Sequence, residues 1–202
     1  MEIIRKLESA IGGRWLGVSL YAVPVKRKTE HVCPQVNRFC ETLKIASVSK
    51  VLIDPHQFTC PGARYAFGCG NDLKKSMIDK LVDKKGYNAA VAKQLIEKTP
   101  HCQDEIHAIG INTSENPGMY IAELQPMQAM RLVQIYQKML EKIFQTEISS
   151  VLSACANVVV KAIQTQDMAI SFGCDDSRAS GSVSQDRLYA GLPSTQARTM
   201  MD

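Results

Sequence analysis

Four of the seven cysteines occur in two similar contexts that could assemble one thiolate site. Cys40 is followed by Cys60 with nineteen residues between them, and Cys155 is followed by Cys174 with eighteen. Each half is expected to run from a cysteine in a helix through a strand to a second cysteine at a turn. This pattern predicts a duplicated unit whose copies face one another across a pseudo-twofold axis, within one chain or across a homo-oligomer.

The second cysteine of each half is followed four positions later by an arginine, Arg64 in one half and Arg178 in the other. Small or turn-forming residues also follow these cysteines, as "PGA" and "DDS". Backbone N–H groups at such turns can point at cluster sulfur, and the two arginines would offset the negative charge of a thiolate site. Both arginines are therefore candidate cofactor-binding residues, with an ion pair to a nearby aspartate as the alternative for each.

Four converging thiolates are the ligand set of a structural zinc ion or of an iron–sulfur cluster. Zinc sites commonly draw their cysteines from C-x-x-C pairs, and the sequence contains none. Ligands that come singly from separate elements suit a larger cofactor. We therefore expect Cys40, Cys60, Cys155 and Cys174 to bind one [4Fe-4S] cluster, for electron transfer or cluster-based redox chemistry.

Two other functions stay open from the residues alone. The chain could be a zinc-binding structural or interaction protein, in which the metal supplies folding free energy. It could instead be a thiol-dependent enzyme with Cys60 as nucleophile and His56 as base. Pro55 and Pro61 argue against the continuous helix that would align those two side chains.

Three cysteines lie outside the duplicated pattern: Cys33, Cys69 and Cys102. A competing ligand set would combine Cys33 and Cys69 with the two cysteines of the first half, but it would leave the second half unexplained. Any one cysteine taken alone could also be a buried apolar side chain.

The composition is that of a globular protein, with 45% hydrophobic and 22% charged residues and a formal net charge of +4. This small charge, without aromatics interleaved among lysines and arginines, argues against nucleic-acid binding. Neither a secretory signal nor a run of some twenty apolar residues occurs. We therefore expect a cytoplasmic protein without a membrane segment, whose cysteines serve metal or redox chemistry rather than disulfides.

The elements that must position these residues alternate along the chain, which predicts an α/β or α+β fold with a mixed sheet covered by helices. We expect helices over 3–11, 34–47, 125–144 and 154–163, two polar helices within 71–100, and strands over 15–25, 50–54, 106–112, 118–124, 168–172 and 187–193. One domain should span 1–193, with related halves at about 33–68 and 150–182, a helical insertion at about 71–100, and a loose tail at 194–202.

Two helices carry patterns that bear on packing and partners. In the helix over 125–144, the expected buried side consists of Met127, Met130, Val133, Leu140, Ile143 and Phe144. In the insertion, lysines lie mostly away from the apolar stripe: Lys74, Lys75, Lys80, Lys84 and Lys85. These lysines form either a solvated face or a docking surface for an acidic redox protein partner.

Six segments in order, "RFCETLKIAS", "TCPGARYAFG", "MQAMRLVQIY", "SACANVVVKA", "SFGCDDSRASG" and "LYAGLP", resemble a family of archaeal and anaerobic bacterial proteins, the ArCR domain of unknown function. The resemblance covers about 15–193. It implies ligand cysteines at Cys40, Cys60, Cys155 and Cys174 and an arginine like Arg178, and it leaves the other three cysteines outside the pattern. "GCDDSRASG" departs from the family in lacking a glycine nearer the cysteine. The family implies no established reaction.

Overall fold

The computed structural model describes residues 2–26, 28–32, 35, 38–180 and 182–202. Within these residues, seven strands form one mixed sheet in the order β2-β3-β4-β1-β5-β7-β6. β2 and β3 are parallel, and the other neighbours are antiparallel. The strands are β1 (Arg14–Tyr21), β2 (His31–Val32), β3 (Lys50–Ile53), β4 (Ala108–Ile111), β5 (Met119–Leu124), β6 (Ala169–Ser171) and β7 (Leu188–Pro193). The predicted mixed sheet is confirmed.

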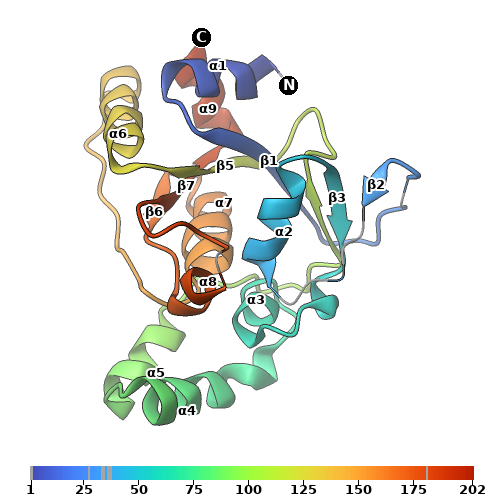
Figure 1. Ribbon diagram of the computed structural model, residues 1–202, viewed down its shortest axis with the longest axis vertical. Coiled ribbons are helices and arrows are strands. Elements are labelled where there is room, and N and C mark those ends of the chain that lie inside the picture. Colours follow the sequence, from blue (N-terminus) through green and yellow to red (C-terminus); the bar gives the residue numbers. More distant parts are fainter. Residues whose placement is uncertain (1, 27, 33–34, 36–37, 181) are drawn as a thin grey trace.

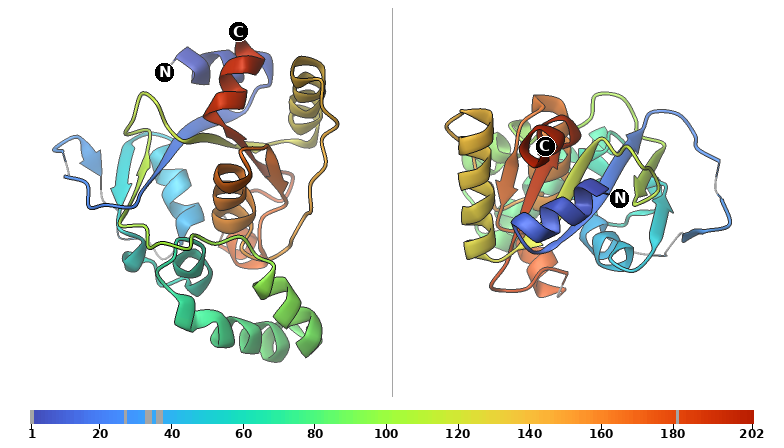
Figure 2. Two further views of the ribbon diagram at one scale, coloured as in Figure 1. Left: turned by 180° about the vertical axis from the view of Figure 1, so that it is seen from behind. Right: turned by 90° about the horizontal axis from the view of Figure 1, so that it is seen from above.

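Helices cover both faces of this sheet (Figures 1 and 2). On one face lie α1 (Glu2–Ala10), α6 (Pro126–Leu140) and α9 (Ser194–Met201). On the other lie α2 (Phe39–Ala46), α3 (Pro61–Ala66), the π-helix η3 (Ser153–Val160), α7 (Lys161–Thr165) and α8 (Asp175–Ala179). Farther out on that second face lie α4 (Lys74–Lys85) and α5 (Ala89–Glu97), and two short 3₁₀ turns are η1 (Pro55–Gln57) and η2 (Asn71–Leu73).

Alternate side chains of the central strands pack into the cores on opposite faces of the sheet. In β1, Trp15 belongs to the core under α1, α6 and α9, whereas Leu16 and Val18 belong to the core on the cysteine-bearing face. In the neighbouring strand β5, Tyr120 and Ile121 divide in the same way. Successive side chains of a strand point to opposite faces, so each central strand contributes to both cores.

The two halves of the chain share one order of elements. Apart from β2, the 3₁₀ turns, α4 and α5, the first half runs β1, α2, β3, α3, β4 with strand order β3-β4-β1. Apart from α6, the second half runs β5, η3–α7, β6, α8, β7 with strand order β6-β7-β5. The central strands β1 and β5 are antiparallel neighbours, with Arg14 opposite Glu123 and Val18 opposite Met119. In each half the second cysteine lies between a strand and a short helix: Cys174 comes three residues after β6 ends, whereas Cys60 comes seven residues after β3 ends, with η1 between. Descent from a duplicated unit stays a prediction.

The prediction of a loose C-terminal tail is wrong. Residues Ser194–Met201 form α9, in which Ala197 and Met200 are buried against the core shared with α1 and α6. The segment looks polar along the chain, but its few apolar residues at helical spacing suffice to dock it. Both termini consequently lie on the same face of the sheet (Figure 1).

The predicted buried side of the helix over 125–144 is also wrong in part. α6 ends at Leu140, and Met127, Met130 and Ile143 are 58%, 47% and 80% exposed. The buried stripe instead contains Ala129, Leu132 and Tyr136. The apolar residues of α6 occur on all sides of the helix, so the pattern in the sequence did not determine which side packs against the sheet.

Several predicted boundaries shift. The strand over 15–25 ends at Tyr21, and the helix over 34–47 occupies Phe39–Ala46, while 33–34 and 36–37 lie outside the described residues. The range 71–100 contains η2, α4 and α5. Gly86 ends α4 with a left-handed φ of 70°, and the Asn88 side chain caps α5 by accepting from the Ala90 N–H at 2.9 Å.

Candidate metal centre

The four cysteines with matching contexts line one cavity on the helical face that α4 and α5 cover. Cys40, Cys60, Cys155 and Cys174 all contribute to its wall, and its volume is about 110 Å³. One water molecule needs roughly 10–15 Å³, so the cavity has room for a group of several atoms. Figure 1 shows α2, α3, α8 and the chain entering α7 gathered on this side of the sheet.

Each of these cysteines lies at the beginning of a helix. Cys60 and Cys174 directly precede α3 and α8 in extended conformation, Cys40 is the second residue of α2, and Cys155 is the third residue of η3. The first N–H groups of a helix have no acceptor within the helix and favour negative charge nearby. The four sulfurs therefore approach the cavity from four helix N-termini.

The sulfurs are not packed as closely as the ligands of one metal ion. In the described part of the chain, one group of three or more His, Cys, Asp or Glu ligand atoms lies mutually within 4.8 Å, and it contains none of the four cavity cysteines. No three of the four sulfurs are therefore that close together. Tetrahedral zinc with bonds of about 2.3 Å holds its sulfurs about 3.8 Å apart. A single ion would require inward movement of these helix starts.

Three of the cavity thiols, those of Cys40, Cys60 and Cys155, have raised pKa values, which favour the protonated form when no metal is bound. Burial raises the pKa of Cys40 to about 11, although a hydrogen bond with Ser182 opposes the shift. Burial also raises the pKa of Cys60, against the lowering effect of backbone N–H groups in α3. The pKa of Cys155 lies well above its usual value because of burial and then the three neighbouring cysteines. Metal binding at these sulfurs would thus release protons.

The segment that carries Cys155 has an unusual backbone. η3 is an eight-residue π-helix, a rare conformation that is often found at functional sites, and Leu152 before it has a left-handed φ of 48°. The Asn157 side chain donates to the carbonyl oxygen of Val151 at 2.8 Å. The Ser153 hydroxyl accepts from the Gly173 N–H at 2.8 Å. The first bond is local to the η3 segment, and the second holds the start of η3 against the residue before Cys174.

Arg38 lines the cavity, although the sequence analysis did not single it out. It precedes α2 and donates to the Glu41 carboxylate at 2.8 Å. Burial disfavours its charge, but the hydrogen bond to Glu41 and the negative charge of that carboxylate raise the pKa of Arg38 overall. The only signal in the sequence was an arginine two positions before a candidate ligand.

The two arginines predicted to bind the cofactor do not line the cavity. Arg64 donates to the Cys69 carbonyl at 3.3 Å. Arg178 donates to the carbonyl oxygens of Phe172, Ser184, Gln185 and Arg187. The repeated arginine therefore binds backbone carbonyls of the loops beside each short helix.

The insertion covers the open side of the cavity with lysines and apolar side chains. Lys80 of α4 contacts the Asp176 carboxylate at 2.6 Å, and Lys85 contacts Asp175 at 3.2 Å. Both lysines line the cavity together with Met77. Two of the lysines considered for partner docking are thus directed at the start of α8.

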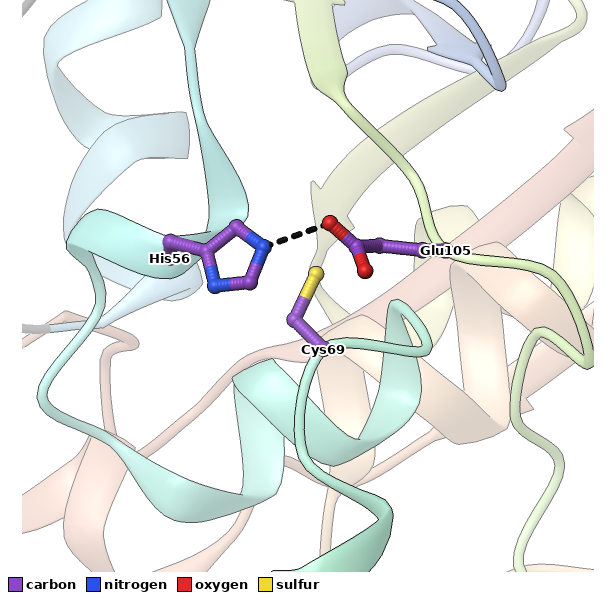
Figure 3. Close-up of side chains that lie close together, drawn as sticks. All are labelled: His56, Cys69 and Glu105. Atoms are coloured by element: carbon purple, nitrogen blue, oxygen red, sulfur yellow. Dashed lines mark hydrogen bonds and ion pairs between the residues drawn. The ribbon is translucent and has the colours of Figure 1, made fainter.

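A second group of chemically active side chains lies outside the cavity. The Nε2 atom of His56 and the Oε1 atom of Glu105 are 2.7 Å apart, and the sulfur of Cys69 lies beside them (Figure 3). The sequence analysis paired His56 with Cys60, but no histidine of the described chain lines the cavity of Cys60. Cys102 belongs to neither group, and Cys33 lies outside the described residues.

The sequence of the chain matches a known protein family over most of its length. Residues 16–202 match the model of the family described as uncharacterised ArCR, DUF169. The chain belongs to the ArCR family. The chain is also similar to the protein described as "Uncharacterized protein MJ0308" of Methanocaldococcus jannaschii. The two are 25% identical over 178 residues, which cover 82% of this ArCR chain and 75% of the relative. No solved structure matches the ArCR chain.

The predicted family membership is therefore confirmed. One further finding concerns the membrane. Over the described ranges of this ArCR chain, none of the helices combines the length and the apolar character needed to cross a bilayer.

Proposed function

We propose that this ArCR protein is an iron–sulfur protein that binds one [4Fe-4S] cluster through Cys40, Cys60, Cys155 and Cys174. The observation that carries the proposal is the convergence of these four sulfurs, from four helix starts in two halves of the chain, on one cavity. Four cysteine thiolates are the usual ligand set of such a cluster.

The spacing of the sulfurs supports a cluster over a single zinc ion. In a cluster each cysteine binds a different iron, so the sulfurs stay farther apart than around one ion. No three of the four cavity sulfurs lie mutually within 4.8 Å. A zinc-binding structural or interaction protein is the alternative function, and it would need a contracted site.

The surrounding side chains fit a group with negative charge. Arg38, Lys80 and Lys85 bring positive charge to the cavity wall. Backbone hydrogen bonds from α3 and η3 also favour the thiolate forms of Cys60 and Cys155. Met77 and Leu81 are buried apolar residues of α4 that also line the cavity, and apolar side chains around a metal site limit the access of solvent. Charge and solvent access are the main means by which a protein adjusts the reduction potential of a cluster.

When bound, such a cluster supplies one-electron transfer, and full cysteine ligation favours electron transfer over substrate binding at iron. The chain would hold the cluster, shield it beneath α4 and α5, and present the lysines of α4 near it. An acidic redox protein is the partner that such a surface suits. A thiol-dependent enzyme is less well supported, because His56 lies with Cys69 and Glu105 instead of with Cys60.

Chemical analysis of protein purified without oxygen tests the proposal directly. About four irons and four acid-labile sulfides per chain, with broad visible absorption, are expected for one such cluster. Stoichiometric zinc without sulfide would overturn the proposal in favour of the structural alternative. Absence of both metals after anaerobic reconstitution with iron and sulfide would leave the cysteines as packing or thiol residues.

A further inference from the structure

Three side chains from three separate segments place different ligand atoms close together. His56 lies in η1, Cys69 follows α3, and Glu105 precedes β4. A nitrogen, a sulfur and an oxygen from these residues all lie within 4.8 Å of one another. Figure 3 shows the Cys69 sulfur directed toward the space beside the imidazole and the carboxylate.

This group is separate from the four-cysteine cavity. Cys60 precedes α3 and faces the cavity, whereas Cys69 follows the same helix and does not line the cavity. The His56 and Glu105 side chains are 47% and 45% exposed, and Cys69 is 8% exposed. The group therefore has a buried sulfur and a side open to solvent.

The backbone holds the three residues in place without help from a ligand. The Cys69 N–H donates to the Arg64 carbonyl at 2.9 Å, and the Ile106 N–H donates to the Phe67 carbonyl at 3.0 Å. Gly68 adopts a left-handed φ of 78°, and a Cβ atom there would lie 2.5 Å from the Asp104 carbonyl oxygen. Only glycine permits this approach of the loop before Glu105 to the turn before Cys69.

The local charges favour a cation. The Asp54 carboxylate accepts from the His56 backbone N–H at 2.9 Å, so a second carboxylate lies close to the group. Burial raises the pKa of Cys69 to about 11, and the negative charges of Glu105 and Asp54 add to the shift. A bound divalent cation would reverse this preference by stabilising the thiolate.

We propose that His56, Cys69 and Glu105 bind one divalent zinc ion, as a second metal site in addition to the proposed cluster. Imidazole nitrogen, thiolate sulfur and carboxylate oxygen are the three ligand types that zinc takes in proteins. Three protein ligands leave the fourth tetrahedral position for water or a small ligand, and the exposed side of the group gives access to it.

Metal titration of the full-length protein, freed of loosely bound metal by a chelator, tests this site. Zinc should bind with one equivalent at this group, and cobalt should give the sulfur-to-metal absorption of a thiolate ligand. His56→Gln and Glu105→Gln should each weaken zinc binding at least about tenfold to a hundredfold, the loss that even outer-shell changes cause. Because both side chains are about half exposed, these variants should keep the fold, as circular dichroism can verify.

Cysteine variants locate the absorption and separate the two sites. Cys69→Ser should abolish the cobalt–thiolate band, whereas Cys102→Ser should retain it, because Cys102 is not in the group. Cys102 is a matched control, because burial raises the pKa of its thiol to about 11 as well. Cys155→Ala should retain the band and lose only iron. No bound equivalent in the parent protein, or unchanged zinc affinity in both His56→Gln and Glu105→Gln, would overturn the proposal, whatever the iron content.

Discussion

Cys155→Ala is the most informative change at the proposed cluster site. Cys155 is 8% exposed, and the three other cavity cysteines all contribute to the raised pKa of its thiol. It therefore lies near all three of the other cysteines. The matched control is Cys102→Ala, which removes a partly buried thiol that packs against the same core but does not line the cavity.

The loss of folding free energy in metal-free Cys155→Ala can be worked out from the burial of one neutral sulfur. Burial of a group of methylene size contributes about 0.8 kcal/mol, and the space left behind raises the cost of deletion to about 1–2 kcal/mol. No charge is lost, because the thiol is protonated. For a chain of 202 residues, each kcal/mol lowers Tm by about 2–4 °C. The metal-free variant should therefore stay folded, with a Tm lower by about 2–8 °C.

The cofactor-bound protein should respond very differently. Iron and sulfide content of anaerobically purified Cys155→Ala should fall by more than half, because one of four ligands is gone, while Cys102→Ala should match the parent. Iron analysis, the visible spectrum and thermal unfolding of both forms measure these effects. Equal iron loss in the two variants, or full iron content in Cys155→Ala, would refute the assignment of the ligands.

Three further predictions concern stability and titration. Met200→Ala should destabilise the protein by about 2–5 kcal/mol in denaturant unfolding, because its side chain is 4% exposed within α9; a loose tail would give no change. Tyr136→Phe removes a hydrogen bond of 2.6 Å to the Asp167 carboxylate and should cost about 1.5–3 kcal/mol at pH 7. Burial opposes the charge of Asp167, but its hydrogen bonds lower its pKa overall. The stabilisation by this hydrogen bond is therefore present above about pH 4 and is lost as pH falls through the pKa of folded Asp167. The difference in unfolding free energy between the parent and Tyr136→Phe should shrink over that pH range. In the metal-free folded protein, alkylation of Cys40 and Cys69 should accelerate about tenfold per pH unit up to about pH 11, and a plateau at pH 8 in mass-spectrometric rates would contradict the raised pKa values.

Much of the fold is predictable because local pattern determines it. The apolar runs of β1 and β5, the left-handed Gly86 and the cap at Asn88 are short-range features, and the expected elements occur at these places. The buried side of α6 is not predictable in this way. Apolar residues occur on all sides of this helix, and packing against the core that it shares with α1 and α9 buries Leu132 and Tyr136.

The candidate site also has features that local pattern predicts and features that depend on tertiary contacts. Cys60 and Cys174 could be matched because each stands in a short stretch with turn residues and an arginine. That match could not show where the arginines point. The guanidinium of Arg178 reaches backbone carbonyls of its own loops, whereas Arg38, Lys80 and Lys85 line the cavity.

The sequence by itself determined the two repeated cysteine contexts and the alternation of helices and strands, because both are properties of neighbouring residues. Only the tertiary structure decided that the four cysteines share a cavity and that α4 covers it. It also decided that His56 meets Glu105, which lies 49 positions farther along the chain. Contacts across such separations depend on the packing of whole elements around the sheet, and no local pattern records them.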